Sequence, residues 1–364
     1  MRKKIYHIHT DSKFLHDSKR FDDARFENIL VIIGQEPIVE LLSFQTVFLS
    51  LDNRNLINQM VLTTKDADLI VLYGLCPIKL KFLKKINKKH KILWRFFGYE
   101  LYGKRKDLMF DSETFERLEE KRGINGLLRK IKRNFINRQE SRLRKKIDYI
   151  LLFSEEEYNF LKKYWNIPSF IKLNLYNDPI NWEIENIKKE DFLLIGNSSS
   201  PYNNHLEILN QLKQYHGGKI RFKLFFSYGS SGKYPQLVKS KGKEIKNLEF
   251  LDKFLSKVEF ESIYDAASAL VINSYRQHAL ANIFTGIRRG VKIYLHPKNS
   301  IKTWLENEGF LVFSTKDLLN DLNNHSIKLS LNEIRENLEA LHKLQLKNNQ
   351  EGFNNKILEI IEKE

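Results

Sequence analysis

Cysteine and long apolar runs are the scarcest features of this 364-residue chain. Its single cysteine, Cys76, excludes an intrachain disulfide and fits a reducing compartment. No stretch reaches the roughly 18 consecutive apolar residues of a membrane-spanning helix, so no transmembrane segment is expected. Polar residues such as His7, His9 and Asp11 interrupt the segment where a signal peptide would have its apolar core, so we expect no export signal.

Acidic residues are also few relative to basic ones. Lys and Arg number 61 against 45 Asp and Glu, a formal net charge of +16. This excess indicates an anionic partner, which is nucleic acid, an anionic lipid surface or a phosphorylated substrate. From Lys121 to Lys146 the chain holds eleven basic residues and one acid, with apolar residues at helical spacing. This pattern predicts either a basic amphipathic helix on an anionic membrane surface or, equally, a solvated helix packed on its own domain.

Short apolar runs alternate with helical patterns along the whole chain. The alternation predicts parallel βαβ units, with functional loops at the carboxyl ends of the strands. Because the length exceeds one comfortable core, we predict two α/β domains with a cleft between them. The first spans 1–178 and the second 188–345, joined by a polar linker over 177–190, and a C-terminal helix at 346–364 packs back on the first domain.

The strands and helices follow from the apolar patterns. The predicted strands of the first domain are 4–9, 29–33, 47–49, 68–73, 91–97, 149–153 and 171–175. Those of the second domain are 192–195, 221–226, 248–250, 269–273, 292–295 and 312–313. The predicted helices include 38–44, 78–86, one beginning at 155 after a Ser154 cap, one beginning at 205, one around 253–258 and a long one from 334.

The second domain opens with the sequence FLLIGNSSSPYNNH, from Phe192 to His205. Its apolar run predicts a buried strand, and the small polar residues after it predict a tight loop that leads into a helix. Phosphorylated ligands bind where such loops and helix N-termini meet at the strand ends of α/β sheets. A simple turn and helix cap is the alternative. The candidate phosphate-binding residues of this loop are Gly196, Asn197, Ser198, Ser199 and Asn203.

A second loop, in SYRQHALANIFTGIRRG (274–290), follows another predicted strand. It places Arg276 at a helix start, in a span (266–305) without any acid, where a guanidinium and free N–H groups favour a diphosphate. Helix capping alone is the weaker alternative. Neither this loop nor SYGSSGK (227–233) has the spacing of a P-loop or a GxGxxG motif, so NTPases and Rossmann oxidoreductases are disfavoured. The further candidates on this side are Tyr228, Tyr275, Gln277 and Asn282.

Two carboxylates in the first domain are candidates for a general base. Asp11 follows the first strand and Glu100 lies in WRFFGYELY, and either one could deprotonate a hydroxyl, although an exposed or capping carboxylate is the more frequent role. Asp66 and Asp68 form a D-x-D pair, but they precede their strand, so we predict a turn and no metal site. The candidates that share this side of the domain are His9, Lys13, Trp94, Gly98 and Tyr102.

Four segments resemble one family in the same order along the chain. They are WRFFGYELY, LLIGNSSSPYNNH, SYRQHALANIFTGIRRGVKIYLH and WLENEGFLVF. Together they resemble the bacterial TDP-N-acetylfucosamine:lipid II N-acetylfucosaminyltransferases, a 4-alpha-L-fucosyltransferase-like family. The resemblance implies a GT-B fold, in which two Rossmann-like domains with parallel sheets face a cleft and the second domain holds the nucleotide-sugar. It also implies a lipid-linked acceptor and a cytoplasmic, peripheral location at the inner face of the membrane.

Carried over by position, the GNS loop of the family falls on Gly196, Asn197 and Ser198, and its Arg-Gln pair on Arg276 and Gln277. The family pattern WGxDLY becomes FGYELY, so Phe97 replaces tryptophan and Glu100 replaces aspartate. The acid is kept but displaced by one methylene, which leaves the acceptor and the role of Glu100 open.

The residues predict metal-independent transfer of a sugar from a nucleotide-diphosphate donor, without a cofactor. The resemblance further implies that the donor is a TDP-sugar and that the acceptor is a polyprenyl-diphosphate-linked saccharide in bacterial surface polysaccharide synthesis. Arg276, the following helix N-terminus and the amides of Asn197 to Ser199 would stabilise the leaving diphosphate. Because residues 266–305 lack acids, we expect no carboxylate there for ribose hydroxyls. A non-enzymatic nucleic-acid-binding protein is the alternative from another class, less favoured because of the phosphate-compatible loops. A protein that binds sugar nucleotides without turnover is the third.

Overall fold

The protein is described by a computed structural model that covers residues 1–34, 44–118, 137–175, 178–184 and 188–363. The chain forms two compact units. The first contains Met1–Glu100, Arg122–Tyr176 and Asn348–Glu364, and the second contains Leu101–Lys121 and Asn177–Lys347. The predicted helix at 38–44 and most of the basic segment from Lys121 to Lys146 lie outside the described residues.

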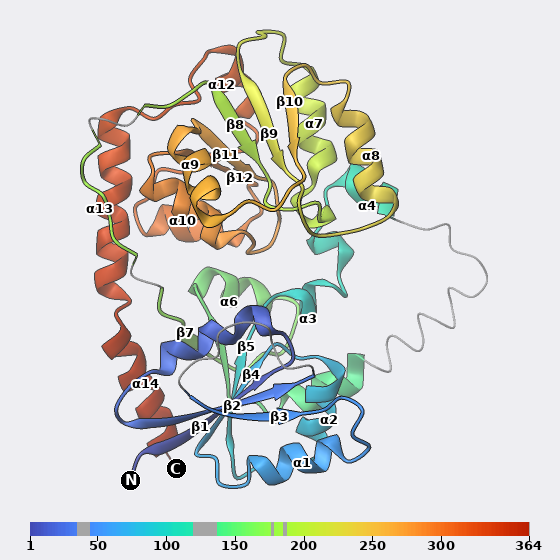
Figure 1. The fold of residues 1–364 in the computed structure, drawn as a ribbon, viewed down its shortest axis with the longest axis vertical. Coiled ribbons are helices and arrows are strands. Elements are labelled where there is room, and N and C mark those ends of the chain that lie inside the picture. Colours follow the sequence, from blue (N-terminus) through green and yellow to red (C-terminus); the bar gives the residue numbers. More distant parts are fainter. Residues whose placement is uncertain (35–43, 119–136, 176–177, 185–187, 364) are drawn as a thin grey trace, which may run out of the picture. The chain divides into compact units, whose positions relative to one another are not determined.

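A seven-stranded parallel sheet with the order β3-β2-β1-β4-β5-β6-β7 forms the centre of the first unit (Figure 1). Continuous apolar runs such as Leu69–Tyr73 form its inner strands because both faces are covered. Its strands are β1 (Lys3–His9), β2 (Phe26–Ile33), β3 (Gln45–Leu49), β4 (Leu69–Tyr73), β5 (Lys91–Arg95), β6 (Tyr149–Leu152) and β7 (Ser169–Lys172). Its helical segments are η1 (Ser12–Phe21), α1 (Leu56–Thr63), α2 (Pro77–Lys85), α3 (Tyr99–Tyr102, which begins in this unit), α6 (Glu155–Lys162) and α14 (Gln350–Glu362).

The C-terminal helix α14 belongs to the first unit. Its side chains Phe353, Ile357 and Ile360 are buried in one hydrophobic cluster with Ile5 of β1 and residues of five further strands. Asn349 caps the helix by accepting the N–H of Gly352 at 2.7 Å. The last 17 residues of the chain therefore complete the core of the unit in which the chain begins.

The second unit is built on a six-stranded parallel sheet with the order β10-β9-β8-β11-β12-β13. Helices α7 and α8 cover one face of this sheet, and α9 and α10 cover the other (Figure 1). Its strands are β8 (Phe192–Ile195), β9 (Arg221–Phe225), β10 (Leu248–Leu251), β11 (Ala269–Ile272), β12 (Lys292–Leu295) and β13 (Phe313–Ser314). Its helical segments are η2 (Lys106–Leu108), α4 (Ser112–Leu118), η3 (Pro201–Asn203), α7 (His205–Lys213), α8 (Lys233–Gly242), α9 (Lys257–Ala266), α10 (Leu280–Arg288), α11 (Ser300–Asn307), α12 (Leu318–Asn323) and α13 (Leu331–Lys347).

Residues 101–121 differ from the predicted ranges, because the structure groups them with the second unit. Thr114 on α4 donates its N–H and its hydroxyl to the two carboxylate oxygens of Glu207, each at 2.8 Å. The Glu113 carboxylate accepts hydrogen bonds from Lys241 of α8 and Asn210 of α7. These polar contacts attach α4 to the second unit, although the chain up to Glu100 and from Arg122 onward belongs to the first.

Two further predicted elements are placed differently. The helix expected around 253–258 begins only at Lys257, because Ser256 and Glu259 form a capping box there. The strand expected at 171–175 is Ser169–Lys172, which begins two residues earlier and ends three residues earlier. By contrast, the strand Phe192–Ile195 and the Ser154 cap of α6 are confirmed.

Candidate functional site

The carboxyl ends of β8 and β11 mark the point where the strand order of the second sheet reverses. From β8 the chain adds β9 and β10 on one side, and β11, β12 and β13 then follow on the other. In open α/β sheets, ligands bind outside the strand ends at such a switch point. The loops that leave this point hold the predicted phosphate-binding residues, 196–204 after β8 and 273–279 after β11.

The loop after β8 is held in place by its own polar side chains. Ser199 donates its N–H to the Tyr228 carbonyl at 2.7 Å, and its hydroxyl lies 3.0 Å from the same oxygen. Asn203 donates to the Ser198 carbonyl at 3.1 Å, and Asn197 donates to the Tyr228 hydroxyl at 3.3 Å. The Ser199 amide is thus engaged within the protein, which corrects its predicted role toward a diphosphate. Asn203, 2% exposed, braces the loop.

Gly196 makes the sharp turn that ends β8. Its φ of +63° lies in the left-handed region, and a Cβ built there would lie 3.2 Å from His205 Nε2 and 3.3 Å from Asn203. Gly218 has a similar φ of +68° but open space around it. The two glycines therefore share a backbone strain and differ in packing.

We expect Gly196→Ala to destabilise the protein more than Gly218→Ala. Both variants carry the left-handed strain of about 1–2 kcal/mol, and only Gly196→Ala also forces a methyl group against buried side chains. Urea unfolding of the two variants measures the difference. Equal losses would show that packing around Gly196 does not matter.

The loops after β8 and β11 are joined by paired amide side chains. Asn204 donates to the Asn273 carbonyl at 2.9 Å, and Asn273 donates to the Asn204 carbonyl at 3.2 Å. Both side chains are buried. The sequence reading missed this pair, although Asn273 stood out as the polar residue at the end of a buried strand. The amide pair fixes the spacing of the two loops.

Arg276 lies in the second of these loops, 8% exposed. Its guanidinium carbon is 4.7 Å from the centre of the Tyr202 ring, which stacks on Phe110 at 5.5 Å on another side. The adjacent Gln277 is half-buried, and its Oε1 accepts no hydrogen bond from the described residues. The Arg276 guanidinium suits an anionic group of a ligand, and the Gln277 amide oxygen suits a hydroxyl or N–H donor of the same ligand.

Tyr275 and Asn282, the other predicted residues here, have different surroundings. Asn282 donates to the Tyr264 hydroxyl at 2.8 Å and so ties α10 to α9. Tyr275 stacks on His296 with ring centres 4.1 Å apart. Burial and a hydrogen bond with Asp111 raise the pKa of Tyr275. Asn282 is therefore a structural contact, while Tyr275 belongs to a polar cluster.

Asp111, from outside the acid-free span, places a carboxylate close to this loop. It comes from residues 101–121, and its Oδ2 lies 3.8 Å from His296 Nε2. Its N–H donates to Asn204 Oδ1 at 2.9 Å. Burial lowers the pKa of His296 to about 4, so the imidazole is neutral at pH 7. Asp111 is thus a carboxylate available beside Tyr275.

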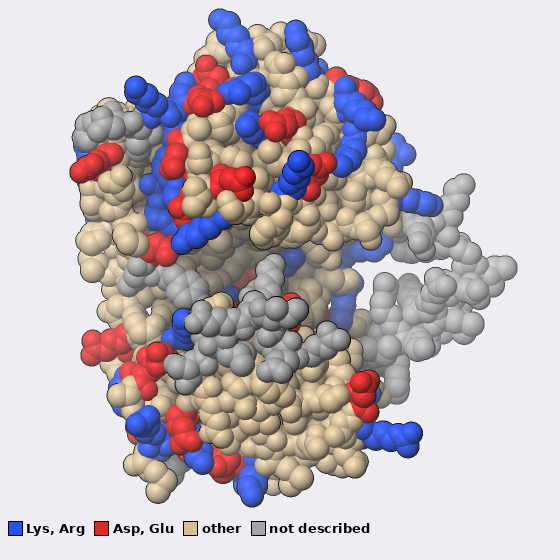
Figure 2. Space-filling model, viewed as in Figure 1, with Lys and Arg blue, Asp and Glu red and all other residues tan. Residues whose placement is uncertain are grey.

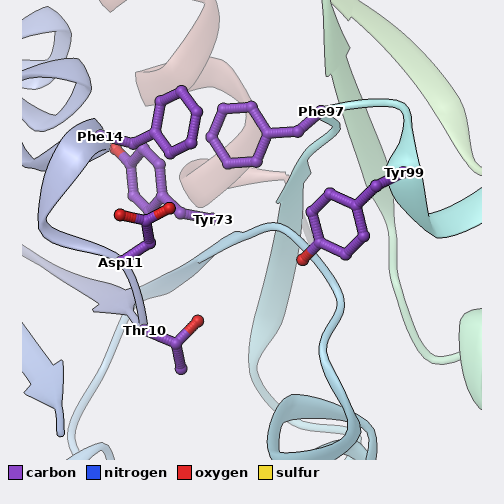
Figure 3. Close-up of a pocket in the computed structure, with 6 residues that line it drawn as sticks. All are labelled: Thr10, Asp11, Phe14, Tyr73, Phe97 and Tyr99. Carbon is purple, nitrogen blue, oxygen red and sulfur yellow. The ribbon is translucent and has the colours of Figure 1, made fainter. Parts of the chain in front are cut away.

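The first unit has its own pocket, of about 230 Å³, among the loops at the carboxyl ends of its strands. It too lies where the strand order reverses, between β1 and β4. Figure 3 shows the rings of Phe14 and Phe97 facing each other, which stack at 4.0 Å, with the Asp11 carboxylate and the Tyr99 ring on different sides of them. The residues that line it are Thr10, Asp11, Phe14, Tyr73, Phe97 and Tyr99.

The two candidate bases have different environments. Asp11 is exposed and lines the pocket. Glu100 is 6% exposed, and its Oε1 accepts the indole N–H of Trp94 at 3.2 Å and the N–H of Phe97 at 3.3 Å. Burial raises the pKa of Glu100. The structure thus places Asp11 in the pocket, while Glu100 holds the turn that carries Phe97.

None of the other acceptor-side candidates whose side chains are described lines this pocket. His9 is buried, stacks on Tyr73 at 3.9 Å and shares a 2.8 Å hydrogen bond with Ser18. Trp94 is fully buried, and Gly98 turns with a φ of +96°. Tyr102 is buried in the second unit, and the side chain of Lys13 lies outside the described part of the structure. The sequence reading missed Tyr73, although it ends the strand next to β1.

The D-x-D pair lies at the amino end of the first sheet. Asp66 accepts Lys4 Nζ at 2.6 Å and the Tyr6 hydroxyl at 2.8 Å, and Asp68 accepts the N–H of Lys4 at 2.7 Å. Both aspartates therefore brace β1. Across the described residues, no group of three or more His, Cys, Asp or Glu side chains is arranged to hold a metal ion. None of the described helices is long and apolar enough to cross a bilayer.

No protein-family model matches the chain, and neither does any curated protein sequence. Membership of the fucosyltransferase-like family thus stays a prediction. Solved structures do match over nearly the whole length. HepE of Anabaena, in complex with UDP and glucose, is 12% identical with a TM-score of 0.63 and covers 98% of this chain and 99% of its own.

Two further structures match as well. The UDP-forming alpha,alpha-trehalose-phosphate synthase of Burkholderia xenovorans is 9% identical with a TM-score of 0.67. The match covers 100% of this chain and 99% of the synthase. Sucrose-phosphate synthase of Thermosynechococcus elongatus is 12% identical with a TM-score of 0.64. The match covers 99% of this chain and 98% of that synthase. At such identities the likeness shows the fold alone. The chain has the α/β fold of GT-B glycosyltransferases, with two units that are each built on a parallel sheet.

Proposed function

We propose that the protein is a glycosyltransferase that takes a deoxy- or amino-sugar from a nucleotide-diphosphate donor. The observation that carries this proposal is the pair of loops at the β8/β11 switch point, which brings Arg276 and Gln277 beside a rigid polar turn. A diphosphate fits such a site because a guanidinium and backbone N–H groups stabilise negative charge. The UDP bound by HepE supports this class of ligand.

The donor is proposed to be a TDP-sugar, with a UDP-sugar as the alternative. The acceptor is proposed to be a polyprenyl-diphosphate-linked saccharide in bacterial surface polysaccharide synthesis. The exposed Asp11 carboxylate among stacked aromatic rings supports a saccharide in the first unit, because rings pack on sugar faces while a carboxylate accepts a hydroxyl proton. The transfer is proposed to need no metal, because the Arg276 guanidinium would stabilise the negative charge of the leaving diphosphate.

The charge distribution gives the nucleic-acid alternative no support. On the described part of the face shown in Figure 2, Lys and Arg side chains are intermixed with Asp and Glu in both units. Many basic side chains are engaged locally, as in the pairs Lys213–Glu244 and Arg221–Glu190. A peripheral association with an anionic membrane stays part of the proposal because of the basic segment from Lys121 to Lys146 in the sequence.

A thermal-shift panel of TDP, UDP, GDP, CMP and DNA or RNA oligomers tests the donor class. A ligand that binds the native state at 100 times its Kd stabilises the protein by about 2.7 kcal/mol. We expect TDP or UDP to raise the melting temperature and the oligomers to leave it unchanged. Stabilisation by oligomers alone would contradict the proposal.

A further inference from the structure

One lysine of α2 is buried while its neighbours are exposed. Lys79 has no exposed surface, whereas Lys81, Lys84 and Lys85 of the same helix lie in solvent. Lys79 is also the third residue of the helix, where the positive end of the helix dipole disfavours a cation. Burial of an ammonium group is unfavourable as well. Helix stability thus gives no reason for a lysine at this position.

The contacts of Lys79 lead to the pocket of the first unit. Its Nζ donates to the Thr10 hydroxyl at 3.2 Å and to the backbone carbonyl of Tyr73. Thr10 and Tyr73 both line the pocket, and they come from the ends of the two strands that flank the switch point. The ammonium group therefore joins the end of β1 to β4 through two residues that line the pocket. One of them, Thr10, directly precedes Asp11 in the sequence.

The two groups that Lys79 Nζ contacts, the Thr10 hydroxyl and the Tyr73 carbonyl, are both neutral. No carboxylate in the described part of the chain lies within ion-pair distance of its Nζ. The acids that act on it through space are Asp11, from the loop after β1, and Glu100, from α3. Its other titratable neighbours are Cys76, which precedes its own helix, and His9 at the end of β1.

We propose that Lys79 is a positioning residue of the acceptor site, which holds Thr10 against β4 and so orients the Asp11 carboxylate toward the acceptor hydroxyl. This inference rests on the proposed function, and it adds a residue that does not touch the substrate. The Lys79 cation acts through the Thr10 hydroxyl, and the Asp11 carboxylate accepts the proton.

The same geometry makes the reaction sensitive to alkaline pH. Burial lowers the pKa of Lys79 to about 8, while Cys76, Glu100 and Asp11 oppose this shift. Burial also holds the pKa of His9 well below its usual value, so His9 stays neutral over the same range. Below about pH 8 the ammonium keeps the charge that strengthens its hydrogen bond to the Thr10 hydroxyl. As the pH rises through about 8 it loses a proton, so the acceptor-dependent rate falls while donor binding does not.

The test compares the pH profiles of kcat for the wild type, Lys79→Met, Lys79→Arg and the exposed control Lys81→Met. We expect Lys79→Met to lower kcat at pH 7 by 10-fold or more with unchanged donor affinity, and to lack a rate loss near pH 8. Lys79→Arg should restore part of the rate without that loss, because a guanidinium stays protonated. Lys81→Met should match the wild type. Equal profiles for Lys79→Met and the wild type would overturn the proposal.

Two further measurements separate this inference from folding and from the proposed function. If Lys79→Met does not fold, Thr10→Val takes its place, because it keeps the shape of the side chain but removes the hydroxyl that Lys79 binds. We expect Thr10→Val to lower kcat and to change the loss of rate near pH 8. Hydrogen exchange needs no substrate. Lys79→Met or Thr10→Val should speed amide exchange in the peptide with Thr10 and Asp11, and Lys81→Met should not. A wild type without turnover refutes the transferase, whereas unchanged exchange in both variants refutes the role of Lys79.

Discussion

Replacing Arg276 by methionine is expected to weaken binding of the preferred nucleoside diphosphate by about 100-fold or more. Hydrogen bonds to a charged group contribute about 1.5–3 kcal/mol each, and a guanidinium can donate two of them to one phosphate. Methionine keeps much of the side-chain volume over the Tyr202 ring but removes both donors. Isothermal titration of TDP and UDP into the variant measures the loss.

Arg221→Met is the matched control for this substitution. Arg221 also lies in the second unit, but it begins β9, is exposed and pairs with Glu190. It is thus at the amino end of a strand, away from the loops that follow the carboxyl ends. We expect its nucleotide affinity to equal that of the wild type. Equal weakening by both substitutions would indicate a general loss of positive charge instead of a site at Arg276.

Asp11→Asn is expected to lower kcat by about 100- to 10,000-fold, the usual contribution of a positioned general base. The amide keeps the size of the carboxylate and cannot accept the hydroxyl proton. Because Asp11 is not one of the proposed donor-binding residues, the donor Kd should not change. Single-turnover kinetics with saturating donor measure the chemical step separately from binding.

Glu100→Gln is the comparison that distinguishes the two candidate bases. Its amide oxygen can still accept the N–H groups of Trp94 and Phe97, so the turn should persist. We expect a loss below about 10-fold, since Glu100 does not line the pocket. A large loss in Glu100→Gln and a small one in Asp11→Asn would exchange the two roles.

The sequence predicted those parts of the fold that depend on local signals. The strand Phe192–Ile195 was predicted with its bounds because an apolar run ends at a glycine, and Ser154 was recognised as a helix cap. The start of α9 was misplaced although its S-x-x-E capping box, from Ser256 to Glu259, was present in the sequence. The start of such a helix can be predicted from the sequence when the capping residues are given more weight than the spacing of apolar residues.

The site was predictable only where it depends on loops after strands. Arg276 and Asp11 each follow a buried strand in the sequence, which predicted that they lie at the carboxyl ends of the strands. Nothing local shows that Asp111 comes from a segment attached to the second unit, since its contacts with Asn204 and His296 are formed by residues far away in sequence. The burial of Glu100 likewise depends on packing against Trp94. Long-range contacts of this kind need the tertiary structure.

The most direct test of the proposed glycosyltransferase is the release of nucleoside diphosphate from TDP- and UDP-sugars, measured with and without an extract of bacterial lipid-linked saccharides. We expect slow release from one donor class, strong acceleration by the extract and a mass increase of the acceptor by one sugar. An Asp11→Asn, Arg276→Met double variant should lose all three. A wild type that binds a nucleotide-sugar but leaves it intact, with and without the extract, would be a binding protein and not a glycosyltransferase.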